Sequence, residues 1–525
     1  MLPLITIALL AFTAAVVVIL RLARPGFGYS WMAAAIGALL AWLSTFLWQV
    51  SLPQTLTLVE WLPQSIFTYS PALLADRVNF PYALSLTSLA PAIIWTSTAR
   101  STTTGPLAWS STLALTGLGL IAVLSGNVLT LLLALAAVDV LELVSTLRVV
   151  DDPVSSNTEV TAFAVRMLGL GLLVWGAVVA YSAGAELNFE SMPPQGSLYL
   201  LLGVGVRMTA VLYRQPNIPL PGLRRGYGTS VGLISAAASL SVLARIPSGS
   251  ISPGATFWLL LFAALVGLVS GINWLRAPDP LEGRRFFLAG MGALAFAAAL
   301  RGSGVGSAAW GSALVFCGGL SSLYTVHQRR LVLALLAAGF MLTALPFSLT
   351  ASGWAGAVVE SWVLWVLLVP VQALMLAGYV SGISRPSQES LEDQPNWARS
   401  IYPAGLVLLL SSGLWLGFFG WEGARQIGVL PAALAATLLG STVGWFFWRI
   451  PGLRRAVQPA VQSGQRLAGG SAIAFRTIST AIWGLYRALG RASGAVARTL
   501  EGDGGLLWTM VILVLFLSLF RTFLR

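Results

Sequence analysis

Lysine is absent from this chain of 525 residues, so all 30 of its basic residues are arginine. Because a guanidinium stays protonated in a protein, no lysine or arginine side chain here can load and release a proton near neutral pH. Histidine and cysteine each occur once, as His327 and Cys317. The single histidine excludes a multi-histidine metal or haem site. The single cysteine argues against disulfides, cysteine-ligated clusters and thiol catalysis.

Charge is also scarce. Only 9% of the residues are charged and 57% are hydrophobic, whereas about 25% are charged in an average soluble domain. No soluble fold can bury so much apolar surface, so lipid must be the solvent for most of the chain. The net charge of +12 does not indicate nucleic-acid binding, because the arginines lie in short loops between apolar runs, a pattern typical of membrane proteins.

The motifs of soluble enzymes are missing as well. The sequence contains no phosphate-binding GxxxxGK[ST] loop, no cluster of metal ligands and no nucleophile with a plausible base. We therefore predict no catalytic residue, no cofactor and no metal in this chain.

Long apolar runs are what the sequence does contain. A bilayer-spanning helix needs about 20 apolar residues, and sixteen runs are long enough. They lie near 3–21, 29–48, 80–98, 107–125, 128–147, 161–182, 197–213, 229–246, 255–275, 286–300, 306–325, 331–348, 356–381, 402–420, 427–448 and 505–523. An even number of spans places both termini on the same side of the membrane.

The arginines between the runs indicate on which side of the membrane the two termini lie. One alternating set of loops carries 22 of them and the opposite set carries 6, while Arg166 and Arg207 fall inside runs. The arginine-rich loops are expected in the cytoplasm, which puts both termini on the outer side of the cell membrane.

One long segment, 452–502, is too polar to span. From Phe475 to Val496 its apolar residues recur every three or four positions, and its arginines fall off that stripe. This periodicity predicts an amphipathic helix that lies along a membrane or protein surface, broken in its first part by Pro459 and by Gly469 with Gly470.

Ionisable residues at membrane depth are costly and therefore mark candidate functional sites. Asp139 and Glu142 lie in the fifth run on one helix face, and Arg207 lies in the middle of the seventh. We expect Asp139 or Glu142 to pair with Arg207. Arg166 lies one turn inside the sixth run, where it can reach the cytoplasmic edge, and Glu360 lies near the outer end of the thirteenth. The pair is either a gate or relay in an ion path or a structural pair that fixes helix register.

Several segments resemble the antiporter-like membrane subunits of complex I and of the multisubunit cation/proton antiporters, and the L-type chain of complex I above all. The similar segments are Ser125-Gly126-Asn127 with the run 128–135, Tyr181 to Phe189, Gly232-Leu233-Ile234-Ser235-Ala236-Ala237, and Leu345-Pro346-Phe347-Ser348. The sixteen runs and the amphipathic segment before the last of them also match that family's layout.

This resemblance implies an all-helical membrane protein of about 16 spans, with two inverted five-helix repeats and a lateral helix. It divides the chain into 1–106 (spans one to three), 107–246 and 255–381 (the repeats), 402–448 (spans 14 and 15), 452–502 (the lateral helix) and 505–525 (the final span). It also implies a non-redox subunit whose partners are other membrane subunits and membrane lipids.

The departures from the family pattern concern its proton-carrying groups. Asp139 falls at the family's fifth-helix glutamate, with Glu142 as a near alternative, and Arg207 replaces its seventh-helix lysine. Ser235 replaces the eighth-helix histidine, and the twelfth-helix lysine would fall near Gly353. We therefore predict a membrane-arm subunit of an NADH–quinone or related oxidoreductase with impaired or no pumping of its own. The alternatives are a structural subunit of another bioenergetic complex and, less favoured, a stand-alone cation/proton antiporter.

Overall fold

A computed structural model describes residues 1–449 apart from 59, 62–68, 100–104, 151–152, 214–220, 248, 250, 327, 357–363 and 386–394. The helices of the first half are α1 (Leu2–Ala23), α2 (Ser30–Leu47), α3 (Phe80–Thr98), α4 (Pro106–Val123), α5 (Val128–Leu147), α6 (Pro153–Ser182), α7 (Pro194–Tyr213), α8 (Pro221–Arg225) and α9 (Tyr227–Leu240). Those of the second half are α10 (Pro253–Arg276), α11 (Pro280–Leu300), α12 (Gly304–Leu323), α13 (Arg329–Ala338), α14 (Val369–Ile383), α15 (Asn396–Trp415) and α16 (Leu430–Arg449).

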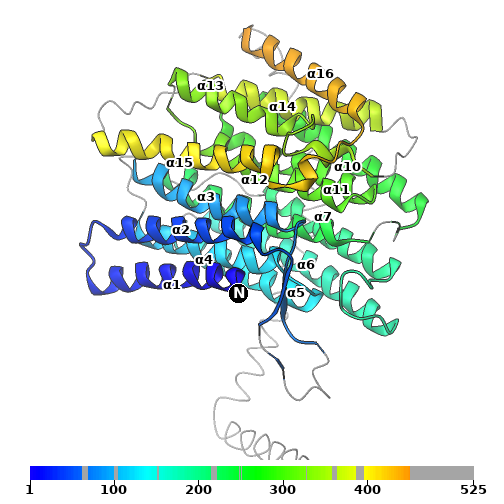
Figure 1. Ribbon diagram of the computed structural model, residues 1–525, viewed down its shortest axis with the longest axis horizontal. Coiled ribbons are helices and arrows are strands. Elements are labelled where there is room, and N and C mark those ends of the chain that lie inside the picture. The colour runs from blue at the N-terminus through cyan, green and yellow to red at the C-terminus, as the bar shows by residue number, and fades with distance from the viewer. Residues whose placement is uncertain are drawn as a thin grey trace, which may run out of the picture. The chain divides into compact units, whose positions relative to one another are not determined.

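The long helices lie side by side in one bundle (Figure 1). Three of them, α3, α9 and α12, form its centre: every residue of α9 is buried, as is α12 from Gly306 to Leu323. The centre contains many alanine, glycine and serine residues, whose small side chains let membrane helices approach closely. At Gly311, for example, a Cβ atom would lie 1.8 Å from the hydroxyl of Tyr82 on α3, so only glycine fits.

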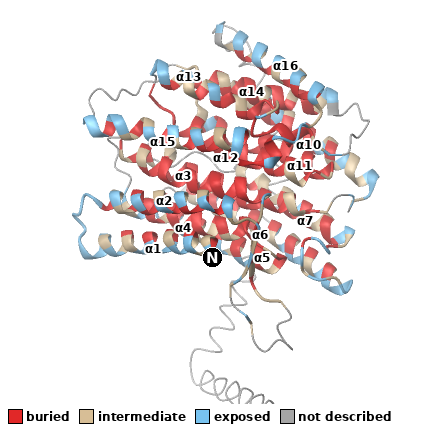
Figure 2. Ribbon diagram, in the orientation of Figure 1, coloured by how far each residue is buried: buried red, intermediate tan, exposed pale blue. Residues whose placement is uncertain are grey.

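The exposed residues lie mainly on the outer helices (Figure 2), and many of them are large and apolar. Phe12 on α1 is 70% exposed, Trp258 on α10 is 67% exposed and Leu438 on α16 is 66% exposed. Such a surface is stable only in hydrocarbon. Twelve helices in the described part of the chain are long and apolar enough to cross a bilayer, which confirms a predominantly helical, multi-pass membrane protein.

Helices of the structure overlap fifteen of the sixteen predicted runs, at least in part, and the sixteenth (505–523) lies outside the described residues, as does the predicted lateral helix 452–502. The weak run near 197–213 is one uninterrupted helix, α7. The total number of spans, the inverted repeats and the division into segments stay predictions.

One predicted run, 331–348, is not a continuous helix. Helix α13 ends at Ala338 and continues only as a 3₁₀ turn, Gly339–Leu342. Two non-glycine residues then adopt positive φ, Ala344 (55°) and Phe347 (64°), on either side of Pro346. Because proline cannot donate a backbone hydrogen bond and disfavours helical geometry in the residue before it, the helix does not resume across Pro346.

A small hairpin precedes α3 and was not predicted. Strands β1 (Gln54–Thr57) and β2 (Ala72–Ala75) pair antiparallel, with Gln54 opposite Ala75. The hairpin holds the start of α5, because the Asn127 side chain donates to Ser70 O (2.8 Å) and accepts from Thr130 N (2.8 Å) as the helix N-cap. The hairpin therefore anchors the helix that carries the buried carboxylates.

Candidate functional site

Helix α5 carries two acidic side chains in the interior of the bundle. Asp139 and Glu142 are one turn apart on the same face, and both are 0% exposed. Isolated carboxylates in such a place would be strongly destabilising. Asp139 and Glu142 therefore require positively charged or hydrogen-bonding partners inside the bundle.

Arg207 on α7 is the principal partner of Asp139. Its Nη1 donates to Oδ2 at 2.6 Å and its Nη2 to Oδ1 at 3.0 Å, a bidentate pair between buried groups. The remaining nitrogen, Nε, donates to Ser239 Oγ on α9 at 3.0 Å, and Nη1 also reaches Arg166 O at 3.3 Å. Each nitrogen of the guanidinium thus has an acceptor, as a buried arginine requires.

Arg166 on α6 is the second cation, and the expectation that it reaches the cytoplasmic edge is wrong. It is only 5% exposed, and its guanidinium pairs with both acids: Nε lies 3.1 Å from Asp139 Oδ1 and Nη1 lies 2.8 Å from Glu142 Oε1. The reason is that α6 begins at Pro153, not near residue 161. Arg166 is therefore about 20 Å along the helix from its start, and its guanidinium is buried against α5.

Together Asp139, Glu142, Arg166 and Arg207 form what we call the charge cluster. It contains two carboxylates and two guanidiniums, so its formal charge is zero. Asp139 is its centre, because it contacts both arginines. A compensated cluster of this kind is compatible with burial, whereas removal of one member leaves an unbalanced charge.

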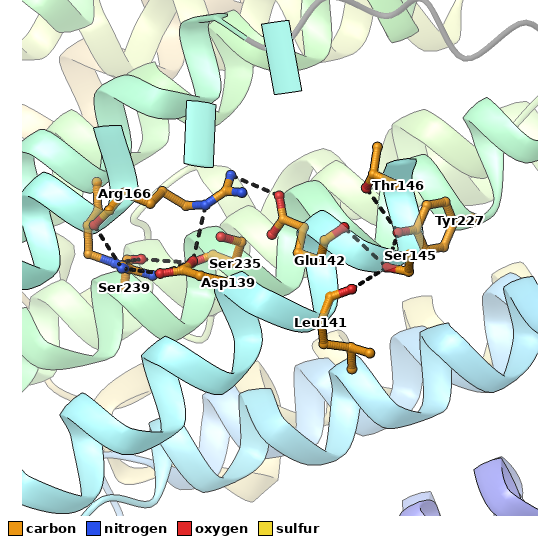
Figure 3. Close-up of polar contacts among 10 residues, drawn as sticks. Asp139, Leu141, Glu142, Ser145, Thr146, Arg166, Tyr227, Ser235 and Ser239 are labelled. Carbon is orange, nitrogen blue, oxygen red and sulfur yellow. Dashed lines mark hydrogen bonds and ion pairs between the residues drawn. The ribbon is translucent and has the colours of Figure 1, made fainter. Parts of the chain in front are cut away.

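The serine that the sequence singled out is not the one that bonds the cluster. Ser239 makes that contact, and Ser235 lies one helical turn earlier on α9, where its carbonyl oxygen accepts from Ser239 Oγ at 2.9 Å. Ser235 is nevertheless buried close to the cluster (Figure 3). Nothing but the i, i+4 spacing in the sequence distinguishes Ser239.

A group of hydroxyls continues from Glu142 along α5. Tyr227, the first residue of α9, places its hydroxyl 2.5 Å from Ser145 Oγ and 3.0 Å from Thr146 Oγ1. Ser145 in turn lies within hydrogen-bond distance of the carbonyl oxygens of Leu141 and Glu142 (Figure 3). Sequence reasoning missed this group, because serine and threonine in a membrane helix usually bond their own backbone.

The second half of the chain has a different arrangement at the position of the family's twelfth-helix lysine. The carbonyl oxygen of Gly353 accepts from Arg301 Nη2 at 2.7 Å and from Trp310 Nε1 at 3.1 Å. A Cβ atom at Gly353 would lie 2.6 Å from the Trp310 ring, so the position has no room for a side chain. Glu360, the remaining predicted site residue, lies outside the described residues.

Among the described residues, no group of three or more histidine, cysteine, aspartate or glutamate side chains could hold a metal ion. What the charge cluster can do chemically is limited by its cations. Both are guanidiniums, which bind carboxylates firmly but do not release protons in the working range of pH. The roles of Asp139, Glu142, Arg207, Ser235 and Glu360 in an ion path stay predictions.

Comparisons with known proteins give similarity in structure only. No family model and no curated protein sequence matches the chain. Among solved structures, the Mrp complex from Dietzia sp. DQ12-45-1b matches over 100% of this chain with 12% identity and a TM-score of 0.64. This chain spans 63% of the length of that one.

Two respiratory assemblies also contain similar chains. Respiratory complex I from Thermus thermophilus with bound NADH matches over 84% of this chain and 100% of its own, at 14% identity and a TM-score of 0.59. The archaeal membrane-bound sulfane sulfur reductase matches over 87% and 96%, at 12% identity and a TM-score of 0.51. The chain therefore has the fold of the antiporter-like membrane subunits found in these complexes.

Proposed function

We propose that this chain is a membrane-arm subunit of a complex-I-like, redox-driven assembly of the cell membrane. The observation that supports this most strongly is the fold, shared over the full length of a subunit of Thermus thermophilus complex I. The three similar solved structures named above support this proposal, because each of them is of a multisubunit complex. Because we predict no redox group in this chain, partner subunits would carry out electron transfer in such an assembly.

We further propose that the subunit contributes little or no proton translocation of its own. Proton transfer needs groups that alternate between protonated and deprotonated forms. The cations of the charge cluster are both arginines, and each carboxylate contacts at least one of them. At Gly353 the second half offers a carbonyl oxygen bonded to Arg301. These features favour a role in holding the membrane arm together.

A second candidate is a structural subunit of a non-redox ion-transporting assembly. The similarity to the Mrp complex, which extends over the whole chain, favours it. The experiment that separates the two is isolation of the chain in mild detergent followed by identification of every chain that accompanies it. We expect redox subunits among them.

The distribution of arginines predicts the orientation of the chain. Single cysteines placed after Arg225 and after Arg399, in a Cys317→Ala background, should be labelled by a membrane-impermeant maleimide only from the cytoplasmic side. A cysteine at the C-terminus should be labelled from outside. Labelling of the C-terminal cysteine from the cytoplasm would contradict the sixteen-span topology.

A further inference from the structure

A narrow apolar crevice opens on the outer surface of the bundle between α7, α10 and α11. Its volume is about 80 Å³. Small and apolar side chains line it almost throughout: Gly205, Met208, Thr209, Leu212, Phe262, Ala263, Val266, Ala289, Gly292, Ala293 and Phe296. Phe262 is 63% exposed beside it, and Val269 on the same helix is 59% exposed, so the crevice faces the hydrocarbon of the membrane.

An arginine lies at one end of this crevice. Arg285 precedes Ala289 by four residues, Gly292 by seven and Phe296 by eleven, so it shares their face of α11. Helical side chains point toward the N-terminus, which directs the guanidinium toward the start of the helix and away from the membrane interior. The guanidinium lies 4.7 Å from the ring centroid of Phe286, and its buried Nε–H finds no acceptor among the described residues.

Arg224 is a second arginine with buried nitrogens that lack an acceptor in the described part of the chain, and it lies near the start of α11. Arg224 ends α8, and its carbonyl oxygen accepts from Arg284 Nη1 at 3.4 Å, so the end of α8 is next to the start of α11. Its Nε and Nη2 are buried and, within the described ranges, lack hydrogen-bond acceptors. A buried donor without an acceptor is destabilising, so these nitrogens favour an acceptor supplied from outside the described residues.

The charge around this point is positive. Arg224, Arg225, Arg284 and Arg285 lie here with two acids, Asp279 and Glu282. Asp279 is already 3.9 Å from Arg225 Nη2, and Arg284 donates to Thr229 Oγ1 at 2.8 Å. Glu282 lies close enough to interact with both Arg224 and Arg285, but it accepts no hydrogen bond from their buried nitrogens named above. An anion is the partner that such a site favours.

We propose that the site binds one anionic phospholipid, with its phosphate on Arg285 and part of one acyl chain in the crevice. From Arg285 to Phe296 the helix rises about 16 Å, which is half of a hydrocarbon core of about 30 Å, the depth of a single leaflet. A crevice of this volume takes a short stretch of one acyl chain, whereas a helix about 10 Å wide does not enter it.

The test measures phospholipid binding to the purified full-length chain by native mass spectrometry, with phosphatidylglycerol and phosphatidylcholine of identical acyl chains as probes. Wild type should bind one phosphatidylglycerol about tenfold more tightly than phosphatidylcholine, the scale of one charge-assisted hydrogen bond. Arg285→Gln should remove this preference. Thr209→Phe, which fills the crevice, should weaken binding of both lipids. Arg330→Gln, which removes an exposed arginine from α13, should bind like wild type.

Two results would overturn the proposal. In the first, wild type and Arg285→Gln bind the two lipids equally, which would mean a non-specific lipid shell. In the second, a photo-crosslinker placed at Thr209 in the native assembly captures a polypeptide and no lipid, which would mean that a partner helix covers this face. Because Arg285 is only partly buried, the Gln variant is expected to fold and gives an answer even if Thr209→Phe does not.

Discussion

Replacement of Asp139 by leucine is expected to destabilise the folded chain by about 3–5 kcal/mol, the cost of breaking a buried ion pair by removing one partner. The cost arises because Asp139 contacts both guanidiniums of the charge cluster. Without it, two buried cations face one carboxylate, Glu142. Unfolding of the purified chain in mixed detergent micelles measures the change.

A double variant tests whether the loss of stability comes from the unbalanced charge. Asp139→Leu with Arg207→Leu removes one charge of each sign and leaves the pair between Arg166 and Glu142 at 2.8 Å. Apolar residues often replace a complete buried pair at little cost, so the double variant should recover most of the lost stability. Ser145→Ala, one turn from Glu142, is the matched control for a polar change on α5 and should cost about 1 kcal/mol. If Arg207→Leu alone unfolds like wild type, the charge cluster does not stabilise the fold.

The second large effect concerns ion movement. The chain reconstituted alone into liposomes should pass neither protons nor sodium ions faster than empty liposomes, because the buried cations are arginines that hold their protons. A pH-sensitive dye and a sodium-sensitive dye inside the vesicles measure the two fluxes, and an added ionophore verifies that each dye responds. Asp139→Asn should be equally inactive. Flux through wild type that Asp139→Asn abolishes would show a working ion path through the charge cluster.

The pairing of Asp139 with Arg207 could be predicted from the sequence. A charged residue at membrane depth needs a partner of opposite charge, and the apolar runs contain few such residues. The position of Arg166 could not be predicted, since the sequence 153–160 is polar enough to resemble a loop. A signal was present nonetheless: Pro153 is the first residue of α6, a position that proline favours. Ser239 and Tyr227 could not be singled out, because their contacts depend on how α9 packs against α5 and α7.

The interrupted helix near Pro346 could not be predicted from the sequence either. An apolar run of eighteen residues has the same composition whether its helix is continuous or ends half-way. The break depends on tertiary contacts, such as the hydroxyl of Thr350, which accepts from Ala344 N and donates to Met341 O. The hairpin of β1 and β2 was missed for a related reason, since each strand has only four residues.

We infer that this chain works as one subunit among several in a membrane assembly. The most direct measurement is isolation of the chain from its native membrane in mild detergent, with mass spectrometry to identify every accompanying chain and its stoichiometry. We predict a stable assembly that contains other membrane subunits together with subunits that carry redox groups, and loss of this chain from it in the Asp139→Leu variant. Recovery of the chain alone, in a form that moves ions across liposomes, would contradict the account.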